Sequence, residues 1–410
     1  MLHPMAAATG TILNSQFGLR SGPLGGTPMK FMHLSDLHIG KSVNSFSMLE
    51  EQKHAFRQIT GYIEAEGPAA VVIAGDVYDR AVPSVEAVRA FDDMLTELAG
   101  TGTAVMVISG NHDSAERLSY ASRLLMEKQL YICGSYDGSI RKVTLADEHG
   151  DVHFWLLPFL KPSAVRGALD DADVESYDDA VAKALGTAGI DWAERNVLVS
   201  HQFYTKPGVT PVRSESELSP VGGLDAVDAG HIGRFDYVAL GHLHGRQSVG
   251  VDNIRYCGSP VKYSFSEWRH EKSANIVELG QKGSCSVKAL PLAPIHDMRE
   301  IRGELDVLTS DEVSSLADKE DYLSVILTDE EEIIDPLGKL RSVYPNIMGL
   351  DFENSRTSID AGAISTTAEK VRRLSPFDLF SEFFLEVQGS TMSPEQADTV
   401  RELLEEEGEE

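Results

Sequence analysis

The chain has 410 residues, and 36 Lys and Arg residues stand against 64 Asp and Glu, which gives a formal net charge of −28 at pH 7. Hydrophobic residues make up 42% and charged residues 24%, a composition that excludes a disordered or fibrous protein and predicts about two or three globular domains. So negative a chain repels a polyanion such as nucleic acid. Any nucleic-acid site would therefore need metal ions or a basic partner to supply positive charge.

The first strands and helices alternate along the chain. Short apolar runs rich in β-branched residues alternate with stretches whose apolar residues recur at helical spacing. This order predicts a sheet with parallel strands and flanking helices. The expected strands are 30–35, 70–74 and 104–108, and the expected helices cover about 49–63 and 85–98.

Further along, the runs 141–145 and 152–157 flank a polar turn and predict an antiparallel pair. Two more buried strands are expected to end at His201 and His242. Ligands in open α/β sheets collect at the carboxyl ends of the strands, because the loops there can direct side chains across the sheet edge. We therefore expect a binding site at those ends.

The remaining segments divide the chain into further parts. Residues 1–28 show no signal-peptide pattern, and we expect a flexible leader before a main domain at 29–280. The acidic, less regular stretch 281–361 predicts a small α+β domain, and 362–410 predicts a linker and a helical hairpin. Two interpretations of the Phe-rich hairpin stay open. It packs on its own domain, or it is a detachable segment that binds a partner, which we favour.

Capping chemistry supports the two hairpin helices. Ser375 precedes Pro376, and Ser393 precedes Pro394 with Gln396 three residues after the serine. A serine oxygen at a helix start can accept hydrogen bonds from backbone N–H groups that the helix leaves unpaired, and Pro fits the first helical position.

The three cysteines are Cys133, Cys257 and Cys285, and no CxxC pair occurs among them. This spacing predicts neither a disulfide framework nor a zinc-thiolate site, and it favours a cytoplasmic location. No apolar run approaches the roughly 18 residues that span a bilayer, so we expect no membrane segment.

Short blocks of polar residues end several of the predicted strands. Asp36 and His38 are two residues apart, so in an extended segment they would point to the same side and hold one ion, as would His242 and His244. Mixed carboxylate, imidazole and amide ligands suit Mn²⁺, Fe²⁺ or Zn²⁺, and their number implies two ions. The blocks are Asp36-Leu37-His38, Gly75-Asp76, Gly110-Asn111-His112-Asp113, His201 and Gly241-His242-Leu243-His244.

The other histidines have no such block beside them. His33 lies within the first predicted strand and is expected in the core. We expect structural roles for the five others considered, which are His54, His153, His231, His270 and His296.

Together the polar blocks resemble the calcineurin-like metallophosphoesterase superfamily from Met29 to about Gly280. The segments MHLSDLHIGK, VIAGDVYDR, ISGNHDSAERL and YCGSPVKYSFSE are similar to the SbcD family of bacterial nuclease subunits, which is related to the Mre-type nucleases. The resemblance implies a four-layered α/β sandwich of mixed sheets flanked by helices, with a small α+β capping domain and a C-terminal helical hairpin.

Ligand roles follow from this resemblance. Two divalent ions, expected to be Mn²⁺, would share Asp76 as a bridging ligand. His112 would face the scissile phosphate and supply a proton or a hydrogen bond, and Asp113 would hold the orientation of that ring. Asp79 stands where archaeal relatives carry a histidine, so we expect no catalytic role for it. One ion would be held by Asp36, His38, Asp76 and His244, and the other by Asp76, Asn111, His201 and His242.

The function implied is a Mn²⁺-dependent DNA nuclease, with double-strand exonuclease and single-strand or hairpin endonuclease activity. Its hairpin would bind an SbcC-type ATPase, and a homodimer would present two sites to DNA ends. The polar blocks alone leave two alternatives open: a hydrolase of small nucleotides or phosphoproteins, and a non-catalytic scaffold. Arg117, Lys262 and Tyr263 are open between contacts to DNA and ordinary surface or packing roles.

Overall fold

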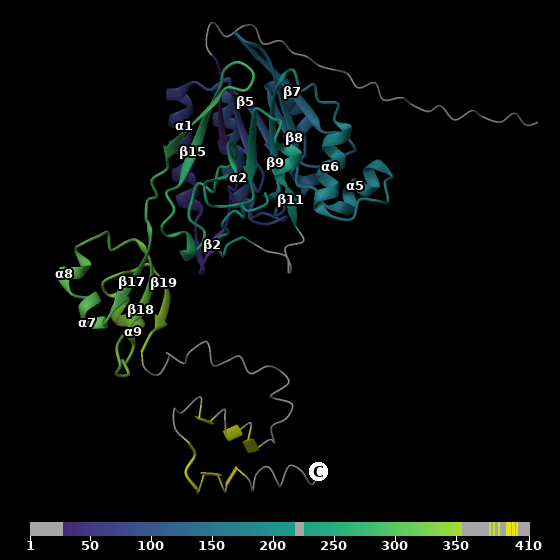
Figure 1. Cartoon of the computed structure of the whole chain (residues 1–410). Helices are drawn as coiled ribbons and strands as arrows, with labels where there is room; N and C mark the ends of the chain where they lie inside the picture. The colour runs from purple at the N-terminus through teal and green to yellow at the C-terminus, as the bar shows by residue number, and fades with distance from the viewer. Residues whose placement is uncertain are drawn as a thin grey trace, which may run out of the picture. The chain divides into compact units, whose positions relative to one another are not determined.

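The computed structural model describes residues 28–217, residues 225–354 and scattered positions between 377 and 400. The chain divides into two compact units, Met1–Ile295 and His296–Glu410 (Figure 1). The leader predicted at 1–28 lies, except for its last residue, outside the described residues.

The first unit contains a mixed sheet with the strand order β16-β15-β1-β4-β5-β6. Four of these strands are parallel, and the hairpin β15–β16 adds antiparallel to β1. The predicted alternation of strand and helix is confirmed. The strands are β1 (Met29–Leu34), β4 (Ala70–Ala74), β5 (Ala104–Ile108), β6 (Leu130–Cys133), β15 (Ser273–Leu279) and β16 (Cys285–Pro291).

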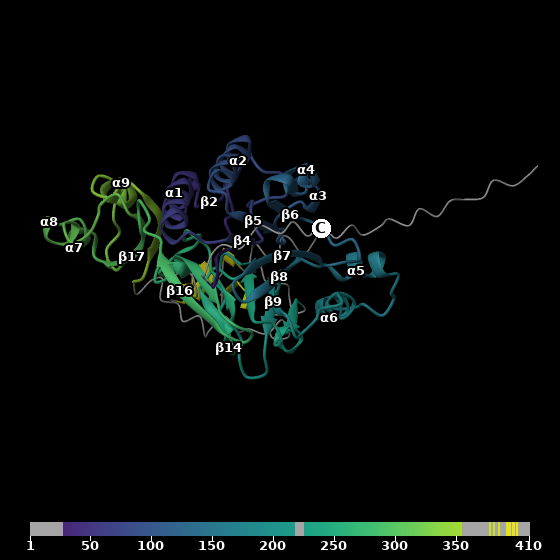
Figure 2. The ribbon, with the colours of Figure 1, turned by 90° about the horizontal axis from the view of Figure 1, so that it is seen from above.

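Helices α1 (Leu49–Glu66) and α2 (Val85–Gly100) cover the outer face of this sheet (Figure 2). α2 begins after Ser84, whose hydroxyl accepts a hydrogen bond from the backbone N–H of Ala87 at 3.2 Å. α1 ends at Gly67, which adopts a left-handed conformation with φ 56°.

A second six-stranded sheet has the order β13-β14-β12-β9-β8-β7. The predicted antiparallel pair is β7 and β8, and the two predicted buried strands are β9 and β12. Helices α5 (Pro162–Leu169) and α6 (Tyr177–Thr187) pack on its outer face. The strands are β7 (Arg141–Asp147), β8 (Gly150–Leu157), β9 (Arg195–His201), β12 (Tyr237–Gly241), β13 (Gln247–Val249) and β14 (Val251–Tyr256).

The inner faces of the two sheets pack against each other through one apolar cluster. Phe31 of β1 meets Phe154 of β8 and Tyr237 of β12 edge-on, with ring centroids 5.2 and 5.6 Å apart. β4 and β5 are buried along their whole length, as expected for strands covered on both faces. The unit is therefore the four-layered sandwich that the sequence predicted.

Short elements occupy the loops of this unit. The strands are β2 (Ser42–Val43), β3 (Phe46–Ser47), β10 (Phe203–Thr205) and β11 (Ala226–Asp228), the helices are α3 (Ala115–Leu118) and α4 (Ser122–Leu125), and the 3₁₀ turns are Met126–Lys128, Ala229–Ile232 and Phe265–Glu267.

The second unit differs from its prediction in two ways. Its three strands are all parallel, so its described part is a small α/β sheet with short connecting helices instead of an α+β domain. The boundary expected at residue 280 falls inside the hairpin β15–β16, whose pairing runs from Ser273 to Pro291. The elements are β17 (Met298–Gly303), α7 (Leu305–Leu308), α8 (Asp311–Ser314), β18 (Tyr322–Leu327), α9 (Pro336–Arg341) and β19 (Ile347–Phe352).

Most of the predicted C-terminal hairpin lies outside the described residues. The capping chemistry at Ser393 is present: its N–H donates to Gln396 Oε1 at 2.8 Å, and the N–H of Gln396 donates to Ser393 Oγ at 3.3 Å. Among the helices of the described residues, none combines the length and the apolar character that crossing a bilayer requires.

The packing between the sheets predicts a large effect of truncating Phe154, which is fully buried. Phe154→Ala should lower the free energy of unfolding of the first unit by about 3–5 kcal/mol, because it removes the ring and leaves a cavity. Val251→Ala, at a side chain that is 44% exposed, should change it by less than about 0.5 kcal/mol. Denaturant unfolding measures both values, and equal effects would contradict this packing.

Candidate metal centre

The polar blocks of the sequence meet at one end of the sandwich, where strands of both sheets stop. Asp36 and His38 follow β1, Asp76 follows β4, His201 ends β9, and His242 follows β12. Because the two sheets pack face to face, the carboxyl ends of these strands bring together loops that are far apart in the sequence.

The backbone conformation that brings the ligand atoms together differs from the one predicted from the sequence. Asp36, His38, Asp76 and His242 are not extended but have positive φ values of 53°, 43°, 49° and 104°. Non-glycine residues adopt such angles at a cost, and they concentrate at functional sites. Asp36 and His38 do lie in one group of potential ligand atoms, but the reason given for this, an extended segment, is wrong.

Three overlapping groups of side chains have ligand atoms within 4.8 Å of one another. The imidazoles of His38 and His244 face each other with 3.1 Å between their Nε2 atoms, and Asp76 Oδ2 lies 3.5 Å from His38 Nε2 and 3.3 Å from His201 Nε2. The groups are Asp36, His38 and His244; His38, Asp76 and His112; and Asp36, Asp76 and His201.

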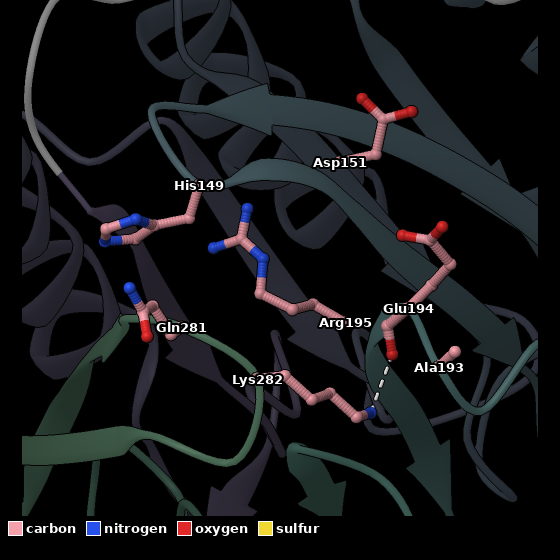
Figure 3. Close-up of a pocket in the computed structure, with 7 residues that line it drawn as sticks. All are labelled: His149, Asp151, Ala193, Glu194, Arg195, Gln281 and Lys282. Atoms are coloured by element: carbon pink, nitrogen blue, oxygen red, sulfur yellow. Dashed lines mark hydrogen bonds between the residues drawn. The ribbon is translucent and has the colours of Figure 1, made fainter.

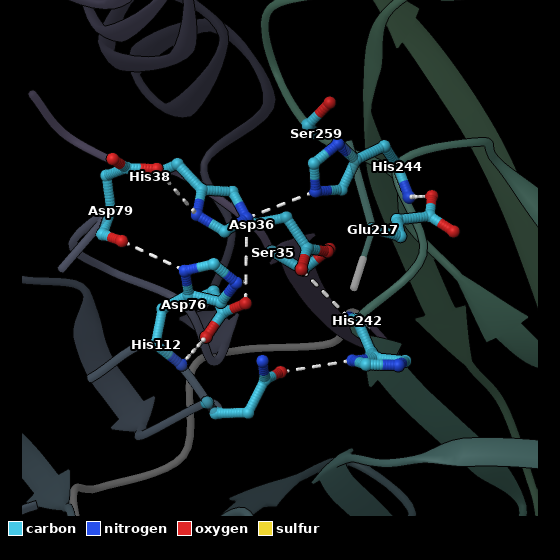
Figure 4. A network of polar contacts seen from close by, with 12 residues as sticks. Ser35, Asp36, His38, Asp76, Asp79, His112, Glu217, His242, His244 and Ser259 are labelled. Atoms are coloured by element: carbon cyan, nitrogen blue, oxygen red, sulfur yellow. Dashed lines mark hydrogen bonds and ion pairs between the residues drawn. The ribbon is translucent and has the colours of Figure 1, made fainter. Parts of the chain in front are cut away.

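Asn111 and His242 complete the set; Figure 4 shows His242 beside Asp36 and His244. The amide oxygen of Asn111 lies 3.1 Å from His201 Nε2 and 3.1 Å from His242 Nδ1. The backbone N–H of His242 donates to Asp36 Oδ1 at 2.9 Å. All seven predicted ligand residues therefore lie in one connected cluster.

Glycines are required where the ligand loops approach each other. A Cβ on Gly110 would lie 2.1 Å from Asp76 Oδ1, and one on Gly241 would lie 1.9 Å from the carbonyl oxygen of Ala74. Neither contact leaves room for a methyl group. These glycines therefore make space for Asp76 and for the neighbouring strand.

Burial and mutual charge shift the pKa values in this cluster. Burial raises the pKa of Asp36 to about 6 and lowers the pKa of His242 to about 3. Burial also favours neutral His201, but the Asp76 carboxylate outweighs it and raises the pKa of His201 to about 9. The raised pKa favours the protonated form of His201. Burial holds the pKa of His38 well below its usual value, which favours the neutral form of that ring.

Some buried atoms of the cluster are suited to an ion. Asp36 Oδ2 and His242 Nε2 are buried and find no hydrogen-bond partner among the described residues. The Nε2 atoms of His38 and His244 face each other at 3.1 Å, where two lone pairs would repel unless a proton or a cation lies between them. A cation would satisfy these atoms together. The donor set therefore fits divalent metal.

His112 and Asp113 lie beside this cluster, but their relation differs from the prediction. His112 Nδ1 lies 2.9 Å from the carbonyl oxygen of Asp79, which can only accept, so Nδ1 carries a proton. Asp113 accepts hydrogen bonds from the backbone N–H groups of Val77, Tyr78 and Gly110 at 3.1, 2.9 and 2.9 Å. Asp113 thus joins two ligand loops, and the main chain of Asp79 orients the ring of His112.

Other side chains that hold the loops were missed in the sequence. Gln52 on α1 donates to the carbonyl oxygens of Leu37 and His38 at 3.2 and 2.8 Å and accepts from the N–H of Gly40 at 3.0 Å. Glu217 accepts from the N–H of His244 at 2.6 Å. A lone Gln or Glu outside a motif gives no signal in the sequence, because only the fold brings it to the loop.

Of the residues left open as DNA contacts, Tyr263 is buried and donates its hydroxyl proton to the carbonyl oxygen of Leu37, so its role is packing. Lys262 donates to the carbonyl oxygen of Trp268 at 2.6 Å, and Arg117 is exposed. His33 is fully buried between Tyr237 and Leu240, which confirms its predicted core position.

A separate pocket lies around the start of β9, at the opposite end of that strand from His201 (Figure 3). Its two long cationic side chains are engaged: Arg195 pairs with Asp147 at 2.5 Å, and Lys282 pairs with Asp236 at 2.7 Å. The pocket therefore does not share the chemistry of the metal centre.

The calcineurin-like phosphoesterase family matches residues 29–246, which include strands of both sheets and every residue of the cluster. The chain belongs to this family and is a metal-dependent phosphoesterase. A second family, described as the type 5 capsule protein repressor C-terminal domain, matches residues 294–388.

Two similar proteins of known name show where the chain lies within this family. The chain is 31% identical to the SbcD subunit of the SbcCD nuclease of Staphylococcus epidermidis over 92% of this chain and 98% of the relative, and 29% identical to the protein of the same name in Staphylococcus saprophyticus over the same shares. It therefore falls among the SbcD relatives within the family.

Solved structures with a similar trace include a dimetal phosphatase from Danio rerio and a phosphopantetheinyl hydrolase from Mycobacterium tuberculosis. The first has a TM-score of 0.37 and 12% identity and covers 66% of this chain and 100% of its own; for the second the values are 0.33, 15%, 65% and 96%.

The close approach of Gly110 to Asp76 gives a direct test of the cluster. Gly110→Ala should weaken binding of Mn²⁺ at least about tenfold, because the new methyl group displaces a ligand carboxylate. Gly61→Ala, on the exposed face of α1 with no atom within 4 Å of its Cβ position, should leave binding unchanged and stabilise the helix by about 1 kcal/mol. Calorimetric titration of both variants measures the difference, and unchanged affinity in Gly110→Ala would contradict the assignment.

Proposed function

We propose that this chain is the nuclease subunit of an SbcCD-type complex and hydrolyses phosphodiester bonds in DNA with two divalent ions. The observation that carries the proposal is the convergence of Asp36, Asp76 and the site histidines at one end of the sandwich. Its similarity to the SbcD subunit of Staphylococcus epidermidis extends over 98% of that protein and includes both units of the chain. The proposed activities are double-strand exonuclease and single-strand or hairpin endonuclease.

In this proposal Asp76 is shared by the two ions. Mixed carboxylate, imidazole and amide donors suit Mn²⁺, and two ions, when bound, would supply hydroxide and neutralise charge on the phosphate. Asp36, His38 and His244 would hold one ion, and Asn111, His201 and His242 would hold the other.

His112 is the proposed proton donor to the leaving oxygen. Its Nδ1 donates to the carbonyl oxygen of Asp79, so Nε2 is the nitrogen available to substrate, and it donates a proton from the doubly protonated ring. The ring lies edge-on to His38 with centroids 4.7 Å apart, at the border of the cluster. Asp113 acts through the backbone that carries His112, because its carboxylate holds the N–H groups of two loops.

The negative charge of the chain bears on how DNA is held. A net charge of −28 disfavours an extended contact with DNA, so the ions and a basic partner must supply attraction. We propose that an SbcC-type ATPase is this partner and that residues 362–410 bind it.

Cytoplasmic location and a homodimer belong to the same proposal. A monomeric mass in sedimentation would count against the homodimer.

Replacing His112 separates metal binding from chemistry. His112→Leu should lower turnover on linear duplex DNA by about 10²–10⁴-fold while two Mn²⁺ ions still bind, because the ring donates to substrate. His153→Leu is a matched control, since that imidazole bonds Thr144 at 2.9 Å in the hairpin β7–β8. Single-turnover cleavage and calorimetry measure the two effects. Loss of both ions in His112→Leu would refute its role.

The same assay distinguishes the alternative substrates. Cleavage of duplex DNA with Mn²⁺ should exceed hydrolysis of phosphomonoesters, cyclic nucleotides and phosphopeptides. A preference for one of these other substrates would indicate that the protein is a nucleotide or phosphoprotein hydrolase. Mn²⁺ binding without any hydrolysis would indicate a non-catalytic scaffold.

Removal of residues 362–410 tests the partner. The shortened chain should retain Mn²⁺-dependent cleavage, because the ligand residues all precede residue 245, but it should no longer bind the purified ATPase. The complete chain should bind DNA weakly alone and more tightly, with a steeper dependence on salt, when the ATPase is present. Equal DNA affinity with and without the ATPase would contradict the proposal, as would ATPase binding by the shortened chain.

A further inference from the structure

A buried ion pair lies directly behind His244. Glu267 is fully buried and Lys272 is 8% exposed, and Lys272 Nζ donates to Glu267 Oε2 at 2.6 Å. Neither residue belongs to the polar blocks, yet both contact the same ligand residue. Charged residues are rarely buried to this degree, and a buried pair adds little to stability by itself.

Glu267 uses its two oxygens for different partners. Oε1 accepts from His244 Nδ1 at 3.0 Å, and Oε2 accepts from Lys272. An ionised carboxylate has no proton to donate, so His244 Nδ1 carries the hydrogen and Nε2 keeps its lone pair. Nε2 is the atom that faces His38, 3.1 Å away. The hydroxyl of Ser216 lies 2.8 Å from the same Nδ1 and donates to Glu267 Oε1 at 2.5 Å.

Lys272 serves both the carboxylate and the main chain. Its Nζ donates to the carbonyl oxygen of His244 at 3.0 Å and to Ser259 Oγ at 2.8 Å. The pair therefore holds both the backbone and the ring of His244.

The other histidines of the cluster have weaker acceptors at their second nitrogen. His201 Nδ1 bonds the neutral carbonyl oxygen of Ala74 at 2.8 Å, and the Asp79 carboxylate lies 3.9 Å from His38 Nδ1, beyond hydrogen-bond distance. A carboxylate that accepts from a ligand imidazole fixes its tautomer and makes it a stronger donor to metal. His244 alone has this arrangement within the described part of the cluster.

We propose that Glu267, held in place by its ion pair with Lys272, is a positioning residue that tightens the metal position formed by Asp36, His38 and His244 relative to the position around Asn111 and His201. The proposal rests on the two-ion site of the proposed function and assigns an order of affinity to its halves. One ion then binds first and more tightly, and its affinity depends on a residue that does not touch it.

Calorimetric titration of the full chain with Mn²⁺ tests this order. The native chain should show two classes of site, and Glu267→Gln should weaken the tighter class about 10–100-fold while the weaker class stays unchanged. Asp147→Asn is the matched control, because it breaks another buried ion pair, with Arg195, at the far end of β9. It should lower thermal stability without changing either affinity.

The double variant Glu267→Gln with Lys272→Met separates positioning from folding. It leaves no unpaired buried charge, so its thermal stability should exceed that of Glu267→Gln, while its tighter site stays weakened. Native Mn²⁺ affinity in the double variant would overturn the proposal, as would native affinity in Glu267→Gln. If Glu267→Gln does not fold, the Mn²⁺ affinity of the double variant tests the proposal instead.

Failure of this inference is distinguishable from failure of the proposed function. A native chain that binds two Mn²⁺ ions and cleaves DNA, with no change in Glu267→Gln, would reject only the positioning role. A native chain that binds no Mn²⁺ would reject the two-ion site, and the positioning role with it.

Discussion

The structure depends on one electrostatic constraint: two carboxylates and several imidazoles are buried together where strands of two sheets end. Asp36 and Asp76 are almost wholly excluded from solvent, and the imidazoles of His38 and His242 beside them favour the neutral form. Burying such groups without a compensating charge is expensive, and a folded protein tolerates it where a cation binds. The packed sandwich provides the rigid support that holds these groups together despite the free energy that their burial costs.

Side chains around the ligand set hold its loops in backbone conformations that are unfavourable by themselves. Four of the ligands adopt positive φ angles, which the chain would leave if its loops were free. Side chains outside the ligand set prevent this: Gln52 holds the first loop, Asp113 joins the second and third, and Glu217 holds the last. Each contributes hydrogen bonds to backbone N–H or carbonyl groups of these loops. The precision of the site therefore comes from residues that need not touch a metal or substrate.

Much of the fold and the ligand set was predictable from the sequence, because both follow from local patterns. The strands Ala70–Ala74 and Ala104–Ile108 have the predicted bounds, since an apolar β-branched run between helices has few other uses. The ligands form compact blocks beside these strands. Residues whose role depends on long-range contact were not predictable: Glu267 lies 23 positions from His244, and Asp113 bonds Val77 across 36 positions. The domain boundary failed for the same reason, because β16 looks like a domain edge until it pairs with β15.

The central claim is that seven side chains between Asp36 and His244 hold two cations, and anomalous scattering from crystals soaked in Mn²⁺ tests it most directly. The account predicts two peaks about 3.5–4 Å apart, both within coordination distance of Asp76. One peak bound elsewhere on the chain, or none near Asp76 with the seven groups directed apart, would contradict it.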